Sequence, residues 1–197
     1  MEKQKFNNRP NPHVVYHYDN GTGIKVHQDY WISRAPAVVG IIFAFGVKDG
    51  SRVLVIKRSN KMRDEPNKYG APSGYLDWDE TGFEGMTREV YEETTLYLPD
   101  YNPFLIFDNN KQPFFIQDDP KKDKNQNISL TYLMVYDFSE DTDFFPIDIE
   151  KHINSETASV EWLKLFDFYN ESREWAFNHD ERIVMAHKFF NSNFTRK

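Results

Sequence analysis

The sequence predicts an α/β fold, a mixed sheet layered with helices, and three observations lead to this class. Continuous apolar runs rich in β-branched and aromatic residues occur at 38–46, 52–58 and 128–138, and such runs are typical of buried strands. A helical spacing of apolar side chains follows Thr81, and a second one occupies 180–190. Strands with a few helices between them indicate sheet and helix layers that share one core.

The composition allows one globular domain and excludes several functional classes. The chain has 197 residues, of which 39% are hydrophobic, and its net charge is −7. An acidic chain is a poor candidate for non-specific binding to nucleic acid or to a membrane surface. A small anionic substrate stays compatible, because a bound metal ion can supply positive charge locally. The absence of cysteine excludes disulfides, thiolate metal sites and a cysteine nucleophile.

The sequence shows neither a membrane span nor a secretory signal. No apolar stretch approaches the ~20 residues that a membrane-spanning helix needs. The first 15 residues are polar and lack the apolar core of a signal peptide. We therefore expect a cytoplasmic protein.

The first elements are predicted as follows. Residues 1–37 are expected to form an N-terminal arm with a short strand within 24–33, and residues 38–197 a single domain with a C-terminal helix. The turn chemistry of 48–50 predicts that the strands 38–46 and 52–58 form a hairpin. The proline and glycine content of 59–74 argues against any regular element there.

The later elements follow from periodicity and length. Thr81 and Glu84 fit a capping box, and Phe83, Met86 and Val90 fall on one helix face, which is expected to pack on the sheet. The polar stretch 108–127 is long for a loop in a compact domain, and such loops are usually functional or mobile. Strands are also expected at 104–107 and 158–165, and the C-terminal helix should turn four residues inward: Ile183, Val184, His187 and Phe190.

Three carboxylates of the first helix share one side. Glu89, Glu92 and Glu93 are spaced i, i+3 and i+4. Like charges at this spacing repel by only a few tenths of a kcal/mol, roughly, so a solvated acidic face is one interpretation. Glu93, however, lies beside Met86 at the edge of the packed face, where a carboxylate needs a counter-charge. Three converging oxygen ligands suit Mg²⁺ or Mn²⁺.

Neighbouring residues fit such a site. Arg88 lies four residues before Glu92 and can brace a ligating carboxylate. The bare backbone of the turn 71–74 can approach a metal ion or a phosphate closely. Glu80 lies at the start of the helix, where unpaired N–H groups favour a carboxylate.

The spacing of these residues resembles that of a known family. The segment Gly74-x5-Glu80-x7-Arg88-Glu89-Val90-x-Glu92-Glu93-x-Thr95-Leu96 is similar to the Nudix box, GX5EX7REUXEEXGU, where U is a bulky aliphatic residue. Eight of the nine defined positions agree. Thr95 stands where the family has the glycine that ends the helix, so this departure concerns the helix terminus more than the ligands. The resemblance covers about 38–166, including the hairpin 38–58, the Tyr69-x-x-Pro72 lead-in, the strand 128–137 and Trp162.

The resemblance implies a fold and an activity. Nudix domains are α/β/α sandwiches around a mixed sheet, and they hydrolyse nucleoside diphosphates linked to another moiety with Mg²⁺ or Mn²⁺. It implies Glu89, Glu92 and Glu93 as metal ligands, joined by the Ser73 carbonyl. Glu92 and Glu93 would be catalytic through the metal, while Arg88 and Glu80 would position the helix.

Other site residues have alternatives. Lys57 or Arg58, at the end of the second strand, could meet the substrate phosphates near Ser73 and Gly74, or could form a solvated strand end. Glu156 is the candidate for a later metal ligand or the general base, against an exposed loop glutamate. Glu140, Asp141 and Asp143 are alternatives for the base.

Aromatic and histidine residues give weaker signals. Tyr75, Trp78, Phe114 and Phe115 could stack on a base, although packing is the plainer interpretation for each. The six histidines show no HExxH pattern and receive no predicted role.

The predicted function is hydrolysis of a small nucleotide, with ADP-ribose or a nucleoside diphosphate sugar favoured. The segment 117–132 is faintly similar to the corresponding part of ADP-ribose hydrolases. Alternatives are a dinucleotide or an RNA 5′ end, for which Lys121-Lys122-Asp123-Lys124 could contact a longer phosphate chain, and a non-catalytic nucleotide-binding Nudix module. A membrane is not an expected partner, nucleic acid other than an RNA 5′ end is not favoured, and a homodimer is compatible because many relatives dimerise.

Overall fold

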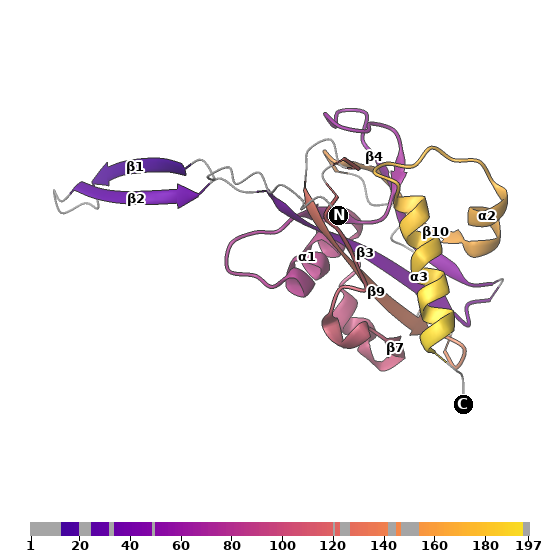
Figure 1. Ribbon diagram of the computed structural model, residues 1–197. Helices are drawn as coiled ribbons and strands as arrows, with labels where there is room; N and C mark the ends of the chain where they lie inside the picture. Colours follow the sequence, from indigo (N-terminus) through magenta and orange to yellow (C-terminus); the bar gives the residue numbers. More distant parts are fainter. Residues whose placement is uncertain are drawn as a thin grey trace, which may run out of the picture. The chain divides into compact units, whose positions relative to one another are not determined.

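The structure is a computed structural model that describes residues 13–19, 25–31, 34–48, 50–119, 121–122, 127–141, 145–146 and 154–194. The chain divides into two compact units, 1–35 and 36–197 (Figure 1). The first unit holds two antiparallel strands, β1 (His13–Asp19) and β2 (Lys25–Trp31). We expected one short strand in this region, so β1 is an addition to the prediction.

The second unit is built on a mixed sheet. Its main strands lie in the order β10 (Thr157–Lys164), β4 (Arg52–Arg58), β3 (Pro36–Phe45), β9 (Ile128–Asp137) and β7 (Leu105–Phe107). The central pair, β3 and β9, is parallel, and the other pairs are antiparallel. The predicted hairpin is therefore correct: β3 and β4 pair across the turn at 46–51.

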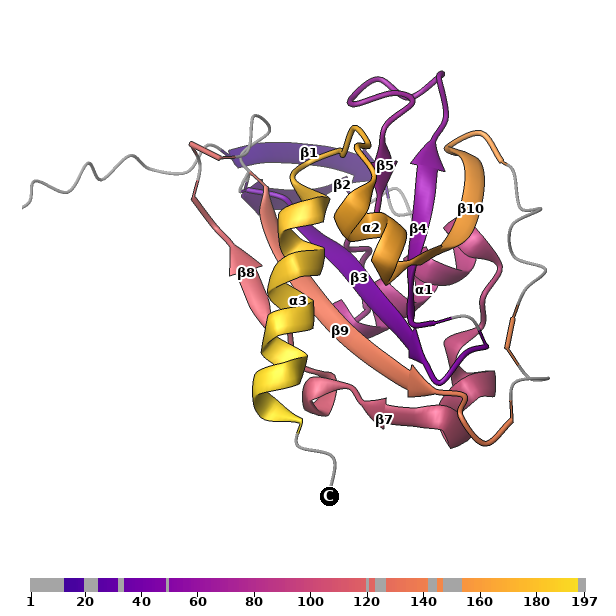
Figure 2. The ribbon, with the colours of Figure 1, turned by 90° about the vertical axis from the view of Figure 1, so that its right-hand side faces the viewer.

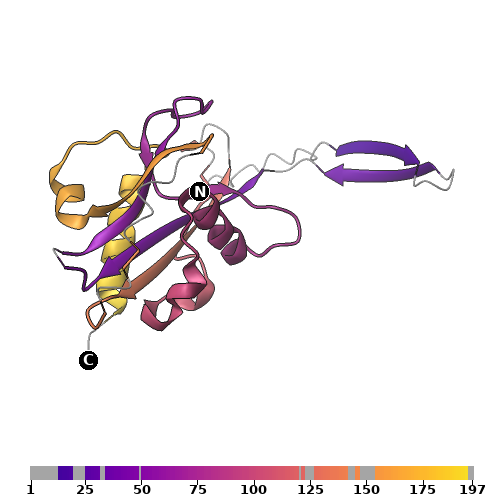
Figure 3. The same ribbon diagram turned by 180° about the vertical axis from the view of Figure 1, so that it is seen from behind.

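Helices cover both faces of this sheet. Helix α1 (Gly82–Thr94) packs on one face and α3 (His179–Asn193) on the other. Figure 2 shows α3 in front of the strands with α1 behind them, and Figure 3 shows the unit from the reverse of Figure 1. The predicted α/β/α sandwich is confirmed. The described residues of this unit also hold three short helical segments: η1 (Leu98–Phe104), η2 (Asn109–Lys111) and α2 (Leu165–Asn170).

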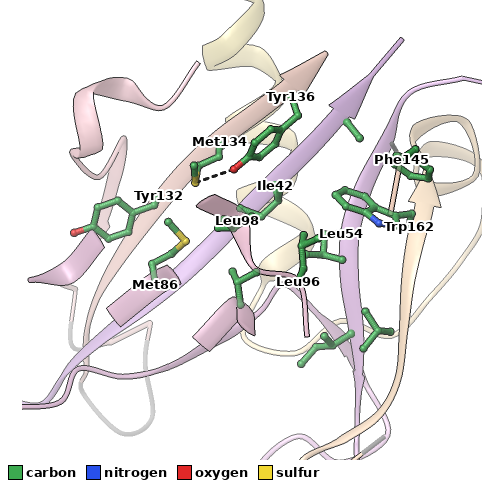
Figure 4. Close-up of a cluster of buried hydrophobic side chains, with 14 of the residues drawn as sticks. Ile42, Leu54, Met86, Leu96, Leu98, Tyr132, Met134, Tyr136, Phe145 and Trp162 are labelled. Carbon is green, nitrogen blue, oxygen red and sulfur yellow. Dashed lines mark hydrogen bonds between the residues drawn. The ribbon is translucent and has the colours of Figure 1, made fainter. Parts of the chain in front are cut away.

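Strand β3 is buried on both faces, which explains its continuous apolar sequence. Ile42 faces the α1 side, where it joins Met86 and Val90, as Figure 4 shows for Ile42 and Met86. Ile41 faces the α3 side with Ile183. Met86 and Val90 are fully buried, as predicted for this helix face.

Glycine at position 40 allows the close contact of α1 with β3. A Cβ there would lie 3.0 Å from Cγ2 of Val90 and 3.1 Å from Sδ of Met86, so a larger residue would push the helix outward. The helix that carries the candidate ligands is thus held close against the central strand.

One prediction about the segment 59–74 is wrong. It holds β5 (Tyr69–Gly70), which pairs with β4, and the start of β6 (Ser73–Tyr75), which pairs with β3. Proline at position 72 falls between the two strands, so it interrupts neither ladder. The stretch 108–127 likewise contains a short strand, β8 (Phe115–Gln117), paired with β9.

The C-terminal helix is longer than its predicted span of 180–190. Ile183 and Phe190 are buried as expected, whereas Val184 and His187 are only half-buried. In the part of the chain that the structure describes, no helix combines the length and apolar character needed to cross a membrane.

Candidate active site

Helix α1 has defined ends, which fix the spacing of its carboxylates. At the N-terminus, Thr81 Oγ1 accepts from the N–H of Glu84, and Glu84 Oε2 accepts from the N–H of Thr81 at 2.8 Å. At the C-terminus, Thr95 is left-handed, with φ 61°, and its N–H donates to the Tyr91 carbonyl at 2.7 Å. The helix therefore ends where a Nudix glycine would end it, although a threonine occupies the position.

Glu93 is a buried carboxylate at the last turn of α1. Its residue exposure is 3%, and its Oε2 accepts a hydrogen bond from the Ser73 N–H at 2.8 Å. Burial raises the pKa of Glu93 to about 8, and the Ser73 bond opposes this only in part. The charges of Glu89 and Glu156 raise the same pKa, and that of Arg58 lowers it.

Glu89 faces the turn that precedes the helix. Burial raises its pKa, while the hydrogen bond from Arg88 opposes the shift. A Cβ on Gly74 would lie 2.1 Å from Oε1 of Glu89, so only glycine lets the turn come this close. The bare backbone expected at this turn thus has a specific neighbour, a candidate metal ligand.

Arg88 connects four groups around the site. Its Nη1 donates to Glu89 Oε1 at 2.7 Å and to Glu92 Oε2 at 2.9 Å. Its Nε and Nη2 donate to the two oxygens of Glu80, and Nη2 also donates to the Tyr75 carbonyl at 3.0 Å. The Glu80 bond raises the pKa of Arg88 further and lowers that of Glu80. These contacts fit the bracing role expected of Arg88 and Glu80.

The strand registers decide which later carboxylate lies near α1. Ser73 pairs with Val39, near the start of β3, and Arg58 pairs with Thr157, next to Glu156. The charge of Glu156 acts on both Glu89 and Glu93, so this exposed residue lies at the same end of the sheet.

The alternative bases do not share that position. Glu140 and Asp141 follow the far end of β9, which pairs with Phe45 at the far end of β3. Val39 and Phe45 are six residue steps apart along the strand, or roughly 20 Å. Asp143 lies outside the described residues.

The two candidate phosphate contacts differ in their surroundings. Arg58 is only 8% exposed, its Nη2 donates to the Asp64 carbonyl at 3.0 Å, and its guanidinium lies 5.1 Å from the Phe177 ring centre. Lys57 is half-buried, with Nζ 5.6 Å from the Tyr69 ring centre. A solvated strand end therefore does not describe Arg58.

The carboxylates fit a hard divalent cation by their chemistry. Within the described ranges, no three acidic or histidine side chains converge tightly enough to form a metal site as they stand, since Arg88 lies between Glu89 and Glu92. Glu93 nevertheless has a single hydrogen-bond partner in the described part of the chain, and the carboxylates of Glu89 and Glu156 lie close enough to raise its pKa. A buried carboxyl group with unused oxygen lone pairs can release its proton and coordinate Mg²⁺ or Mn²⁺.

A buried histidine for which no role was predicted supports the turn at 71–74. His179 is 3% exposed, and its Nδ1 accepts from the Ala71 N–H at 3.0 Å. Burial, together with the charges of Arg182 and Arg58, holds its pKa well below the usual range. The predicted C-terminal helix began at residue 180, so its apolar spacing did not include His179, which lies on the buried face.

The candidate stacking residues separate into two kinds. Trp78 is 87% exposed and Tyr75 is 53% exposed, so the stretch before α1 carries two accessible rings. Phe114 instead packs on Phe189 with ring centres 5.4 Å apart, which is the packing interpretation.

A family model and several solved structures match this chain. The NUDIX domain family model matches residues 34–186. No curated protein matches the sequence. Among solved structures, the chain resembles the NUDIX domain of Shewanella oneidensis NrtR complexed with ADP ribose, with TM-score 0.55 and 20% identity over 88% of this chain and 94% of that one.

Two further structures are similar at lower identity. The C. elegans Ap4A hydrolase has TM-score 0.54 and 16% identity over 80% of this chain and 99% of that one. A bifunctional NMN adenylyltransferase/ADP ribose pyrophosphatase from Francisella tularensis, complexed with AMP and a Mn ion, has TM-score 0.55 and 16% identity over 80% of this chain. This chain spans 42% of the length of that bifunctional protein. With the family match over most of its length, this chain belongs to the Nudix family.

Proposed function

We propose that this protein is a Nudix pyrophosphohydrolase that cleaves the diphosphate of a nucleoside diphosphate linked to another moiety. The observation that carries the proposal is the buried Glu93 carboxylate, grouped with Glu89, Glu92 and Glu156 at one end of the sheet. Family membership supports an enzyme of this kind. ADP-ribose or a nucleoside diphosphate sugar is the favoured substrate, in line with the ADP-ribose bound by the Shewanella domain.

The proposed cofactor is Mg²⁺ or Mn²⁺, held by Glu89, Glu92 and Glu93 with the Ser73 carbonyl. When bound, such an ion neutralises phosphate charge and lowers the pKa of water. Arg88 and Glu80 keep the helix and the preceding turn in register, and Gly74 leaves room for Glu89. The buried Arg58 directs positive charge at the same end of the sheet.

Glu156 is the proposed general base. Its carboxylate takes a proton from the attacking water as the water oxygen bonds to phosphorus and the bridging P–O bond breaks, which leaves two phosphate monoesters. Its exposure suits this role, because a base that returns its proton to solvent must be reachable by water.

A dinucleotide polyphosphate is the second candidate substrate, since the chain resembles the C. elegans Ap4A hydrolase over 99% of that protein. An RNA 5′ end has less support: Lys121 and Lys122 are exposed in the described part of the loop, and Lys124 lies outside it. A non-catalytic module is disfavoured because Glu89, Glu92 and Glu93 are all present.

The test is a turnover assay with Mg²⁺ or Mn²⁺ against nucleoside diphosphate derivatives, with released phosphate monoesters read after phosphatase treatment. The proposal expects hydrolysis of ADP-ribose or a nucleoside diphosphate sugar, abolished by EDTA. Glu156→Gln should lose about 10²-fold or more in kcat, while Glu140→Gln keeps the wild-type rate. If no compound of the panel is hydrolysed with Mg²⁺ and none with Mn²⁺, the proposal is refuted.

A further inference from the structure

A polar pocket lies at the end of strands β4 and β10. Its volume is about 550 Å³, and the structure lines it with two lysines, three asparagines, two serines and one alanine: Lys57, Lys61, Asn60, Asn67, Asn154, Ser59, Ser159 and Ala158. None of these lining residues is acidic or aromatic, although the chain as a whole is acidic. The pocket is therefore a local concentration of positive charge and hydrogen-bonding groups.

The wall of this pocket is shared with the carboxylate cluster. Asn154 Nδ2 donates to the carbonyl of Glu92 at 3.1 Å, and the N–H of Ser59 donates to the carbonyl of Glu156 at 2.7 Å. Lys57 is the residue before Arg58, whose charge reaches Glu93. A ligand that fills the pocket would thus extend from the candidate reaction centre.

Specific hydrogen bonds and a register shift define the backbone around the pocket. Strand β10 shifts its register against β4 between Thr157 and Ser159, next to the pocket. Asn154 Oδ1 accepts from the N–H groups of Glu156 and Thr157, at 2.8 and 2.7 Å, and so fixes the chain before the bulge. The hydroxyl of Thr157 is buried without a hydrogen-bond partner in the described part of the chain.

The lining selects between the two halves of the proposed substrate. A nucleobase gains most of its binding energy by stacking on aromatic surface, and none of the residues that line this pocket in the described part of the chain is aromatic. A sugar phosphate presents a dianionic phosphate and several hydroxyls, which match ammonium, amide and hydroxyl groups.

We propose that this pocket binds the sugar-phosphate half of the substrate, with Lys57 and Lys61 facing the phosphate and the asparagine and serine groups facing the sugar hydroxyls. The inference rests on the proposed function, and it assigns the half of the substrate beyond the nucleotide. For ADP-ribose that half leaves as ribose 5-phosphate.

The test compares the binding of ribose 5-phosphate and AMP, two monoesters of equal charge, by calorimetry in EDTA. The double variant Lys57→Gln/Lys61→Gln should weaken ribose 5-phosphate at least about tenfold and AMP by less than about threefold. The matched control is Lys68→Gln, which removes one charge from the same loop. Lys68 pairs with Glu65 at 2.5 Å and does not line the pocket, so both ligands should bind the control like the wild type.

Two results would overturn the inference. Equal weakening of both ligands would show that the pocket also takes the ribose 5-phosphate group that AMP carries, and wild-type affinity for ribose 5-phosphate weaker than about 10 mM would leave the pocket without its ligand. The outcome is separable from the proposed function, because binding is measured without metal and without turnover. A protein that hydrolyses no compound of the nucleotide panel but shows the selective loss would refute the enzyme assignment and keep the pocket.

Discussion

The N–H of Ser73 donates to Oε2 of Glu93 across 2.8 Å, and this bond joins the turn before helix α1 to the last turn of the same helix. The carboxylate is held at one oxygen in a buried position. The site therefore holds a desolvated carboxyl group, and the nearby charge of Glu89 contributes to its raised pKa.

Glu93 should make the metal-free protein less stable as the pH rises. Its folded pKa is about 8, above its usual value of 4.5, so the contribution of its neutral carboxyl is complete below pH 4.5 and is lost as the pH rises through 8. Glu93→Gln should raise the free energy of unfolding in EDTA at pH 8 by roughly 1 to 4 kcal/mol and by much less at pH 5. Urea unfolding at both pH values measures this, and an equal effect at both would contradict the assignment.

Gly74→Ala should damage the site more than the fold. The new Cβ would lie 2.1 Å from Glu89 Oε1, so the carboxylate must move. We expect a loss of about 10- to 100-fold in Mn²⁺ affinity or kcat/KM. Gly50→Ala is the control for a generic glycine effect, since its Cβ would meet nothing within 4 Å, although its φ of 108° strains any side chain. Wild-type Mn²⁺ affinity in Gly74→Ala would argue against Glu89 as a ligand.

Thr95→Gly should stabilise the protein. A β-branched residue at φ 61° is strained, and glycine removes the Cβ that causes the strain. The expected gain is about 1 kcal/mol, or a rise in Tm of about 2 to 4 °C. Thr95→Ala is the matched control, because it also loses the hydroxyl that bonds to the Thr94 carbonyl but keeps the Cβ. An alanine variant that gains as much as the glycine variant would remove the strain explanation.

His179→Phe should loosen the turn that carries Ser73. It leaves the Ala71 N–H without its acceptor, at a cost of about 1 to 3 kcal/mol at pH 7.5. The folded pKa of His179 lies below its unfolded value of 6.5, so its neutral form stabilises the wild type above pH 6.5, and this contribution falls as the pH drops.

The gap between wild type and His179→Phe should therefore narrow by up to about 1.4 kcal/mol per pH unit below 6.5. Chemical unfolding between pH 7.5 and 5.5 measures the gap. A gap that stays constant with pH would show that folding does not lower the pKa of His179.

The sequence predicted the parts of the fold that local patterns encode. The continuous apolar run of β3 and the helical spacing of Met86 and Val90 are both local sequence signals. Both segments are buried as expected. The strands β5 and β6 escaped because they are two and three residues long and exist only through pairing with β4 and β3. Such short segments have no periodicity of their own to detect.

The candidate site likewise combines features that local sequence patterns reveal with contacts that only the folded chain creates. The spacing of Glu89, Glu92 and Glu93 is local, so it was visible in the sequence. The Ala71–His179 bond joins residues 108 positions apart, and the register that brings Glu156 but not Glu140 to this end comes from strand pairing. No local pattern carries contacts of that kind.

The most direct test of the account is Mn²⁺ binding, followed by electron paramagnetic resonance, together with ADP-ribose turnover in Glu92→Gln and Glu93→Gln. We expect each variant to keep a folded core by circular dichroism, to bind Mn²⁺ at least about tenfold more weakly than the wild type and to lose turnover. Wild-type Mn²⁺ affinity and turnover in both variants would contradict it.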